Sequence, residues 1–143
     1  MKQDILAKQI TELRIILQNI TDGFSVDSAN KNAKLTMERR VLFVLNSNKK
    51  VKPITLITKL GIAKSNLALL CKSMIDGGFI ACEKDENDKR NIYYEITAKG
   101  VAELNQYIDS ISNDVCSICK NEKETKEISK KLEDVIEFLN RKY

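Results

Sequence analysis

Two of the four cysteines have the spacing with the clearest chemical potential in the chain, the Cys116-Ser117-Ile118-Cys119 run. Thiols three positions apart can form a disulfide or give two thiolates to a metal ion. The chain has no histidine, so one protomer cannot complete a tetrahedral zinc site, although two such pairs in a symmetric dimer would supply four thiolates. Three interpretations of Cys116 and Cys119 stay open: a redox sensor, a shared metal site and a structural role.

The other two cysteines, Cys71 and Cys82, have apolar surroundings. Cys71 shares a helical face with Leu67 and Met74, and Cys82 lies in the Phe79–Lys84 run, which has the composition of a strand. Buried thiols usually act as small hydrophobic side chains. We therefore expect both cysteines to be buried and unreactive.

Groups that commonly catalyse reactions do not come together in this sequence. It has no histidine, no glycine-rich phosphate loop and no G-x-S-x-G nucleophile motif. General acid–base or nucleophilic catalysis would need unusual groups. We expect no enzyme activity and no bound cofactor.

Positive charge is concentrated in the middle of the chain. The net charge is +4, but residues 34–100 carry thirteen basic and seven acidic side chains, whereas residues 1–33 are balanced and residues 101–143 have an acidic excess. A basic section between such flanks is typical of a module that faces phosphate groups. Uneven scatter without function is the alternative until a motif supports the charge.

The first residues and the apolar runs indicate where the protein works. Charged side chains in the first eight residues interrupt any apolar core of a signal peptide, and no apolar run approaches the length that spans a membrane. We expect a cytoplasmic protein without a membrane partner. Its thiols are then reduced at rest.

Both ends of the chain show helical apolar stripes. Apolar residues recur every three or four positions from Leu6 to Ile20, from Val101 to Ile118 and from Ile128 to Leu139. A short chain has little core against which to bury these stripes, so mutual burial across a two-fold axis is the simplest arrangement. We expect residues 1–33 and 101–143 to form the helical dimerisation region of a homodimer. Packing against the chain's own middle section is the alternative.

The middle section predicts three helices. A buried helix is indicated over residues 37–46. Pro53 suits the first position of the next helix, because its missing N–H needs no partner there, and Gly61 ends that helix. A further helix follows over Lys64–Asp76, so a tight glycine turn joins two helices.

The outward face of the Lys64–Asp76 helix is small and mainly polar. Leu67, Cys71 and Met74 share the opposite, apolar face. Side chains of this size let a helix enter the major groove of DNA and touch base edges, although a plain solvated face would look similar. The outward residues that we expect to contact DNA are Lys64, Ser65, Asn66, Ala68, Leu69, Lys72 and Ser73.

A hairpin pattern follows Gly77 and Gly78. Phe79–Lys84 and Arg90–Ile96 have the composition of strands, and the polar Asp85–Lys89 run predicts the loop between them. A two-stranded wing therefore follows two helices joined by a tight turn. The predicted fold class is mainly α with a small antiparallel β-wing, a winged helix-turn-helix between N- and C-terminal dimerisation helices.

The Asp88–Gly100 run resembles the wing signature of the MarR family of winged helix-turn-helix bacterial transcriptional regulators. It has an Asp two positions before an Arg, a Thr that closes the strand and a Gly three positions later. The Leu60–Leu67 run is similar to that family's turn and the start of its recognition helix. The resemblance implies a single domain over residues 1–143, with the DNA-binding core at residues 34–100.

The resemblance also implies a function. The protein would be a sequence-specific regulator of transcription, by default a repressor, that binds double-stranded DNA as a homodimer on a near-palindromic operator. A small-molecule effector, or thiol oxidation at Cys116 and Cys119, would release it.

The wing would supply contacts of its own. Arg90 would meet the DNA backbone or minor groove while Asp88, two positions earlier on the same strand face, holds its guanidinium group. Lys89 would meet a phosphate group beside them. A solvent-exposed ion pair without function is the alternative for Asp88 and Arg90.

Two departures from the family pattern shape the expected contacts. Leu69 and Ser73 stand where the family usually has Arg or another polar residue, and Ala63 stands where Ser often precedes the helix. Without an arginine for guanine, we expect Asn66 to pair with adenine, and Ala68 and Leu69 to meet thymine methyl groups. Ala63 leaves the helix without a side-chain N-cap, a loss of about 1 kcal/mol.

The low charge of the recognition helix also supports a second hypothesis. The protein could be a winged-helix module that binds another protein and not DNA. Exposed Leu69 would then lie in the partner contact.

Overall fold

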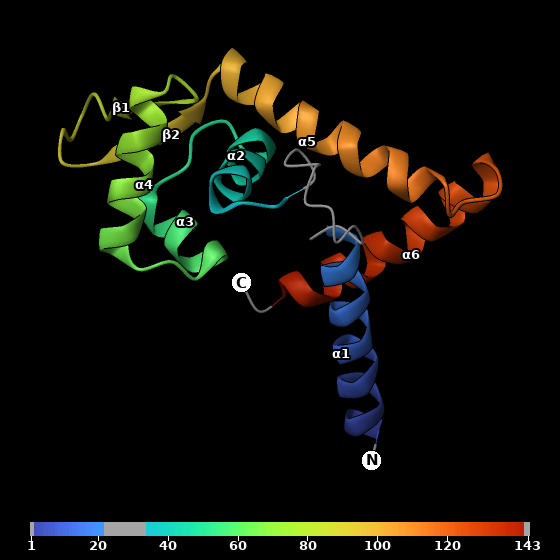
Figure 1. Cartoon of the computed structure of the whole chain (residues 1–143). Helices are drawn as coiled ribbons and strands as arrows, with labels where there is room; N and C mark the ends of the chain where they lie inside the picture. Colours follow the sequence, from blue (N-terminus) through green and yellow to red (C-terminus); the bar gives the residue numbers. More distant parts are fainter. Residues whose placement is uncertain (1, 22–33, 142–143) are drawn as a thin grey trace.

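The computed structural model describes residues 2–21 and 34–141 of the chain. The described residues form six helices and two strands, and Figure 1 shows a compact body from which the terminal helices extend. The mainly helical fold with one antiparallel hairpin is confirmed. The elements are α1 (Lys2–Thr21), α2 (Met37–Ser47), α3 (Pro53–Leu60), α4 (Lys64–Asp76), β1 (Ile80–Lys84), β2 (Ile92–Ile96), α5 (Ala98–Cys116) and α6 (Glu122–Asn140).

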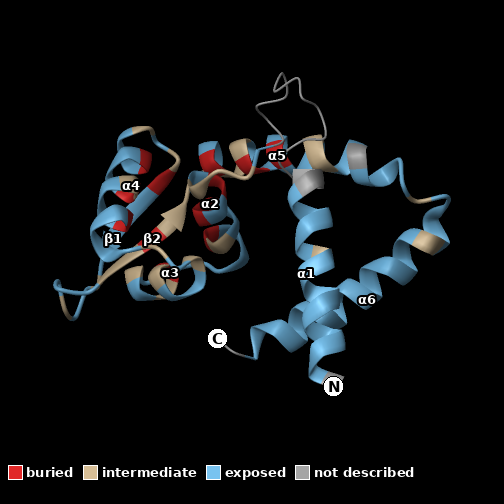
Figure 2. Ribbon diagram, turned by 60° about the horizontal axis from the view of Figure 1, so that its bottom comes forward, coloured by how far each residue is buried: buried red, intermediate tan, exposed pale blue. Residues whose placement is uncertain are grey.

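The hydrophobic core lies within the compact body. Its residues come from α2, the segment before α3, α3, α4, the hairpin and the first half of α5, whereas the described side chains of α1 and α6 are almost all exposed (Figure 2). Leu104 and Tyr107 show that α5 belongs partly to this body. The buried hydrophobic residues are Val41, Leu42, Leu45, Val51, Leu56, Leu67, Cys71, Met74, Ile80, Tyr94, Leu104 and Tyr107.

Side-chain caps fix the start of several helices. The Thr36 hydroxyl accepts a hydrogen bond from the Arg39 amide at 3.3 Å at the start of α2, and the Asn121 side chain accepts one from the Glu124 amide at 2.8 Å at the start of α6. Pro53 occupies the first turn of α3, as predicted.

The sheet is slightly larger than the sequence indicates. β1 and β2 pair antiparallel, with Ile80 opposite Ile96 and Lys84 opposite Ile92. Val51, in the segment before α3, adds an isolated bridge: its amide donates to the Tyr94 carbonyl at 3.0 Å and its carbonyl accepts from the Tyr94 amide at 2.8 Å. This third segment ties the hairpin to the helices.

The boundaries of three predicted elements need correction. β1 begins at Ile80 and β2 at Ile92, so neither Phe79 nor Arg90 is part of a strand. α5 ends at Cys116, so the stripe that appeared continuous to Ile118 crosses a helix end. In the described part of the chain no single helix is long and apolar enough to cross a membrane; only α3 and α4 together reach that length and composition, and they are bent by 114°.

The end of α4 is bonded directly to the start of α5. The Thr97 hydroxyl donates to the Gly78 carbonyl at 2.6 Å and accepts from the Gly100 amide at 3.1 Å, so one side chain both caps α5 and holds the turn after α4. The Thr97 amide also donates to the Phe79 carbonyl at 3.1 Å. Lys99 adds a bond from its ammonium group to the Gly77 carbonyl at 2.6 Å.

Gly100 lies at the closest contact of this α4–α5 junction, which comprises residues 77–79 and 97–100. A Cβ atom at position 100 would overlap the Phe79 carbonyl oxygen and would come within 2.7 Å of Ile96 Cγ1 and 3.1 Å of Leu42 Cδ2. Real Cβ atoms essentially never approach other atoms below about 3 Å. Only glycine therefore lets α5 start this close to the hairpin.

We predict that Gly100→Ala destabilises the fold strongly. Alanine favours a helix by about 1 kcal/mol over glycine, but the overlap with a backbone carbonyl should outweigh this and cost about 3 kcal/mol or more. Urea unfolding followed by circular dichroism would measure the loss. The control is Gly61→Ala, where a Cβ meets no atom within 4 Å and only the positive φ of 62° opposes the change, so a loss of about 1–2 kcal/mol is expected. Wild-type stability of Gly100→Ala would contradict the packing argument.

Candidate nucleic-acid interface

α3 and α4 have the geometry of a helix-turn-helix. Their axes meet at 114°, within the roughly 90–120° of that motif, and residues 61–63 form the connection. Gly61 makes the turn in the left-handed region, with φ 62° and ψ 32°, and its amide donates to the Ile57 carbonyl at 2.9 Å. The predicted bounds of α4 and its glycine turn are confirmed.

α4 has one buried and one exposed face. Leu67, Cys71 and Met74 point into the core, as the periodicity predicts. Leu69 is 70% exposed, which leaves an apolar side chain in the middle of the outer face. The structure places all the predicted contact residues of this helix on the surface: Lys64, Ser65, Asn66, Ala68, Leu69, Lys72 and Ser73.

The N-terminus of α4 has no side-chain cap, as predicted. Ala63 occupies the capping position and makes no cap hydrogen bond with its side chain. Its carbonyl accepts the first helical bond from the Leu67 amide at 2.9 Å. The amides of Lys64, Ser65 and Asn66 thus begin the helix without the acceptor that Ser or Asp would supply.

The wing loop orients Arg90 through a turn. Asp88 Oδ1 accepts from the Arg90 amide at 3.1 Å and from Arg90 Nε at 3.2 Å. The side chain of Arg90 is nevertheless 93% exposed, so its guanidinium group is held and still accessible. The predicted contact between Asp88 and Arg90 is present, but not because the two residues share a strand face: both precede β2. Lys89 lies exposed between them.

A second aspartate orders the same loop. Asp85 Oδ1 accepts from the Asn87 amide at 3.0 Å, and Asp85 Oδ2 accepts from the Tyr93 hydroxyl at 3.3 Å. The Asp85 amide donates to the Asn91 carbonyl at 2.9 Å, which closes the loop at its base. Sequence reasoning misses this role because a polar loop gives no periodic signal; the Asp and Asn content that favours turns is the only indication.

Two lysines before α3 also lie beside the wing, which the sequence pattern does not predict. Lys50 forms an ion pair with Glu83 of β1 at 2.9 Å, and this hydrogen bond raises the pKa of Lys50. The Lys52 ammonium group lies 5.8 Å from the centre of the Tyr93 ring. The bridge between Val51 and Tyr94 brings both lysines to the hairpin. An isolated bridge of one residue leaves no repeating pattern in the sequence from which it could be predicted.

The chain is similar to a known family of DNA-binding domains. A family model described as a winged helix DNA-binding domain matches residues 37–115, more than half of the chain. The chain belongs to the winged helix DNA-binding domain family. A comparison with curated protein sequences gives no significant match.

Solved structures share the fold over nearly the full length of this winged helix protein. The transcriptional regulator Tm0710 from Thermotoga maritima is 18% identical with a TM-score of 0.66, covering 97% of this chain and 96% of that one. FabT from Streptococcus pneumoniae, solved in complex with DNA, is 20% identical with a TM-score of 0.67, covering 96% and 99%. A MarR-like transcription regulator from Bacillus cereus is 22% identical with a TM-score of 0.61, covering 97% and 99%. The MarR-type fold that the wing motif indicated is confirmed.

The cysteines of the winged helix protein differ in accessibility. Cys71 is fully buried, and burial raises the pKa of its thiol, against a smaller opposite effect of its hydrogen bond with Tyr94. Burial also raises the pKa of Tyr94, to about 12. Cys82 is exposed, so its predicted burial is wrong: Ile80 is the only buried residue of β1.

The Cys116–Cys119 pair lies at the end of α5, although the apolar stripe from Val101 to Ile118 predicts a helix that continues past Cys116. Cys116 is the last residue of α5 and is exposed, while half-buried Cys119 lies in the turn before α6. Among the residues that the structure describes, no group of three or more Cys, Asp or Glu side chains is placed to hold a metal ion. The pair is therefore open to solvent reagents, and its metal-binding and redox roles stay hypotheses.

We predict that the four thiols react with a disulfide reagent at two different rates. At about pH 8, Cys82, Cys116 and Cys119 should react fast in the folded protein, whereas Cys71 should react only after unfolding, because its thiol is buried and its pKa is raised. Absorbance of the released thiolate measures the phases. A Cys71→Ala variant should lose only the slow phase, and a fast fourth thiol in the wild type would contradict the buried position.

Proposed function

We propose that the protein is a dimeric, sequence-specific regulator of transcription that places α4 in the major groove of DNA and the wing tip on the adjacent backbone or minor groove. One observation carries the proposal: the exposed face of α4 and the oriented, exposed Arg90 belong to one compact body with a shared core. α4 and the loop that joins β1 and β2 lie at the same end of that body in Figures 1 and 2. The DNA complex of FabT, a structure with this fold, supports the same partner here.

The chemistry of the α4 face favours recognition of A·T pairs. Asn66 can donate to and accept from adenine, and Ala68 and Leu69 can meet thymine methyl groups. Ser65 and Ser73 can bond to either kind of base edge. The helix presents no arginine to guanine, so a contact to a G·C pair would fall to Lys64, Lys72 or the serines.

Affinity would come mainly from outside the recognition helix. Lys64 and Lys72 are the basic residues of α4, whereas Lys89 and Arg90 belong to the wing. Residues 34–100 as a whole have thirteen basic and seven acidic side chains. Contacts to phosphate groups supply sequence-independent binding energy, and each releases counterions from DNA.

We predict that Arg90→Gln weakens DNA binding and makes it less dependent on salt. If Arg90 meets a phosphate group, the slope of log affinity against log salt should fall by about one. Fluorescence anisotropy with DNA selected from a random pool measures this slope. Lys123→Gln on α6 removes the same charge far from the wing and should leave the slope unchanged.

Apolar stripes on the terminal helices support a homodimer. The exposed Ile128, Leu132, Val135 and Leu139 recur every three or four positions on α6, and exposed Ile5, Leu6, Ile10 and Leu17 lie on α1. No described residue of α6 is buried in the single chain. Mutual burial would remove this surface from water and set two α4 helices about 34 Å apart, matched to a near-palindromic operator.

We predict that Leu132→Asp yields a folded monomer. The charge would lie in the apolar contact between subunits, while the core of each subunit contains no residue of α6. Light scattering after size exclusion should show half the wild-type mass, with DNA binding weakened and the helical circular dichroism largely retained. Ser129→Asp introduces the same charge on the same helix and should remain dimeric. A monomeric wild-type protein would refute the dimer proposal.

Repression is the regulatory role that we propose, with release by an effector or by oxidation of Cys116 and Cys119. Both cysteines lie at the connection between α5 and α6, so a disulfide there would change the angle between the helices that set the spacing of the two heads. An effector would act through different affinities for the two arrangements.

A protein-binding module is the second candidate. Leu69 is 70% exposed and Ile54 of α3 is 62% exposed, which is unusual for a surface that only meets DNA. Titration of binding against salt separates the two: affinity for DNA that falls steeply with salt supports the regulator, whereas absent DNA binding or a flat response supports the protein module.

A further inference from the structure

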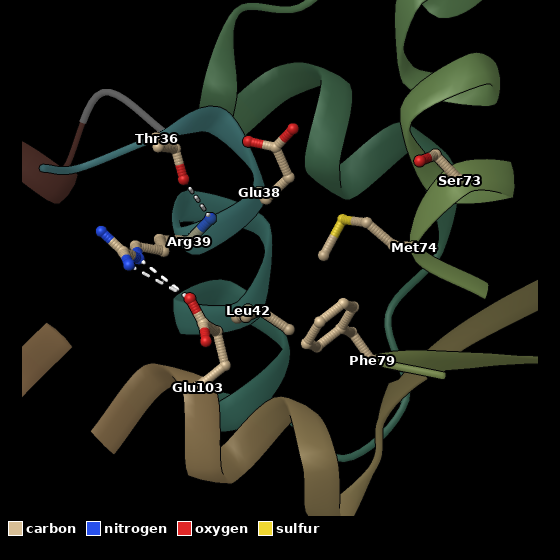
Figure 3. Close-up of a pocket in the computed structure, with 8 residues that line it drawn as sticks. All are labelled: Thr36, Glu38, Arg39, Leu42, Ser73, Met74, Phe79 and Glu103. Atoms are coloured by element: carbon tan, nitrogen blue, oxygen red, sulfur yellow. Dashed lines mark hydrogen bonds and ion pairs between the residues drawn. The ribbon is translucent and has the colours of Figure 1, made fainter. Parts of the chain in front are cut away.

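A cavity separates the recognition helix from α2 and α5. It has a volume of about 290 Å³, near the lower end of the roughly 300–1,000 Å³ of small-molecule sites. Figure 3 shows Met74 and Phe79 pointing toward Leu42 across this space, with Glu38 and Glu103 on the α2 and α5 sides. The residues that line it are Thr36, Glu38, Arg39, Leu42, Ser73, Met74, Phe79 and Glu103.

The base of the cavity is apolar. Leu42 and Met74 are buried in the core, and the half-buried Phe79 ring lies next to them. The same ring already attracts a cation, because the Lys99 ammonium group lies 4.5 Å from its centre while it donates to the Gly77 carbonyl. An aromatic or aliphatic group could therefore fill this base and displace water from it.

The charged groups of the cavity leave a negative excess. Arg39, the only basic residue in the lining, is bound to Glu103: Nε and one terminal nitrogen donate to Glu103 Oε1 at 3.3 and 3.1 Å. The Arg39 guanidinium group also donates to the Lys34 carbonyl and stacks 5.6 Å from the Tyr107 ring. The guanidinium group of Arg39 is therefore already bonded to other groups of the protein.

Glu38 supplies the charge that remains. Its carboxylate is exposed and makes no ion pair or hydrogen bond with any residue in the described ranges 2–21 and 34–141. Glu103 Oε2 likewise accepts no bond among those residues. Two carboxylate groups thus border the cavity, one from α2 and one from α5, and Arg39, the basic residue of the lining, is bound to Glu103 (Figure 3).

We propose that this cavity binds a compact organic cation, with an ammonium or amidinium group between Glu38 and Glu103 and an apolar body on Leu42, Met74 and Phe79. Carboxylates and an aromatic face both attract a cation, whereas the same groups repel an aromatic acid. The cavity therefore selects by the sign of the ligand's charge.

The site is placed to affect DNA binding, and this step rests on the proposed function. Ser73 and Met74 belong to α4, Glu38 to α2 and Glu103 to α5. A ligand between them would contact both the recognition helix α4 and helix α5, which leads to α6. Its occupancy would bias the angle between α4 and α5, which is the change that an effector needs to make.

The test compares two probes with the same aromatic body and opposite charge, 2-naphthylmethylammonium and 2-naphthoate, by calorimetric titration of the 143-residue protein without DNA. The ammonium probe should bind at least about tenfold more tightly than the carboxylate probe. Equal binding, tighter binding of naphthoate, or no binding of either probe would overturn the proposal.

Matched variants locate the site. Glu38→Gln should weaken binding of the ammonium probe by about tenfold, and Glu38→Lys should abolish it and favour naphthoate. Glu127→Gln removes a carboxylate from the surface of α6 and should change neither affinity. If Glu38→Gln binds as wild type does, the ligand lies elsewhere and the assignment is wrong.

DNA binding is measured separately with these proteins. Probe binding without any DNA binding would refute the proposed function and leave the cation site standing. DNA binding without probe binding would refute the cation site alone.

Discussion

The close contact at Gly100 determines how the parts of this protein are arranged. The first turn of α5 lies against the Phe79 carbonyl with no room for a side chain, and the Thr97 hydroxyl joins Gly78 to Gly100 at the same place. These two residues explain the spacing of the wing motif in physical terms. Thr97 caps the helix, because its hydroxyl accepts a hydrogen bond from the amide of Gly100, three positions later. The end of the recognition helix, the wing and the start of α5 therefore meet at one contact.

The sequence predicts best where a pattern repeats. The bounds of α4 follow from its apolar face and flanking glycines, and the buried side chains of α4 are the expected ones. Single-residue features escape such patterns. The Val51 bridge, the exposure of Cys82 and the turn that orients Arg90 all depend on which backbone groups meet across the hairpin. Cys119 lies outside α5 because the helix ends one turn earlier than its apolar spacing suggests.

The proposed interface uses its acidic residues for structure. Asp85 and Asp88 accept hydrogen bonds from the loop backbone and from Tyr93 and Arg90, so they give the wing tip its shape. The same carboxylates lower the local positive potential. The wing thus exchanges some long-range attraction to DNA for a defined position of one arginine, while Lys50 and Lys52 add positive charge at its base.

The missing cap at Ala63 has a consequence for the order of events in the proposed complex. The turn of α4 that carries Lys64, Ser65 and Asn66 lacks a side-chain acceptor for its amides, and a turn without a cap is less stable than a capped one. A phosphate oxygen is the kind of group that completes such a turn. While the protein moves along non-specific DNA, this turn would fray and read few bases. At the operator, the backbone contact and the base contacts would form together, so the search stays fast and the final complex stays selective.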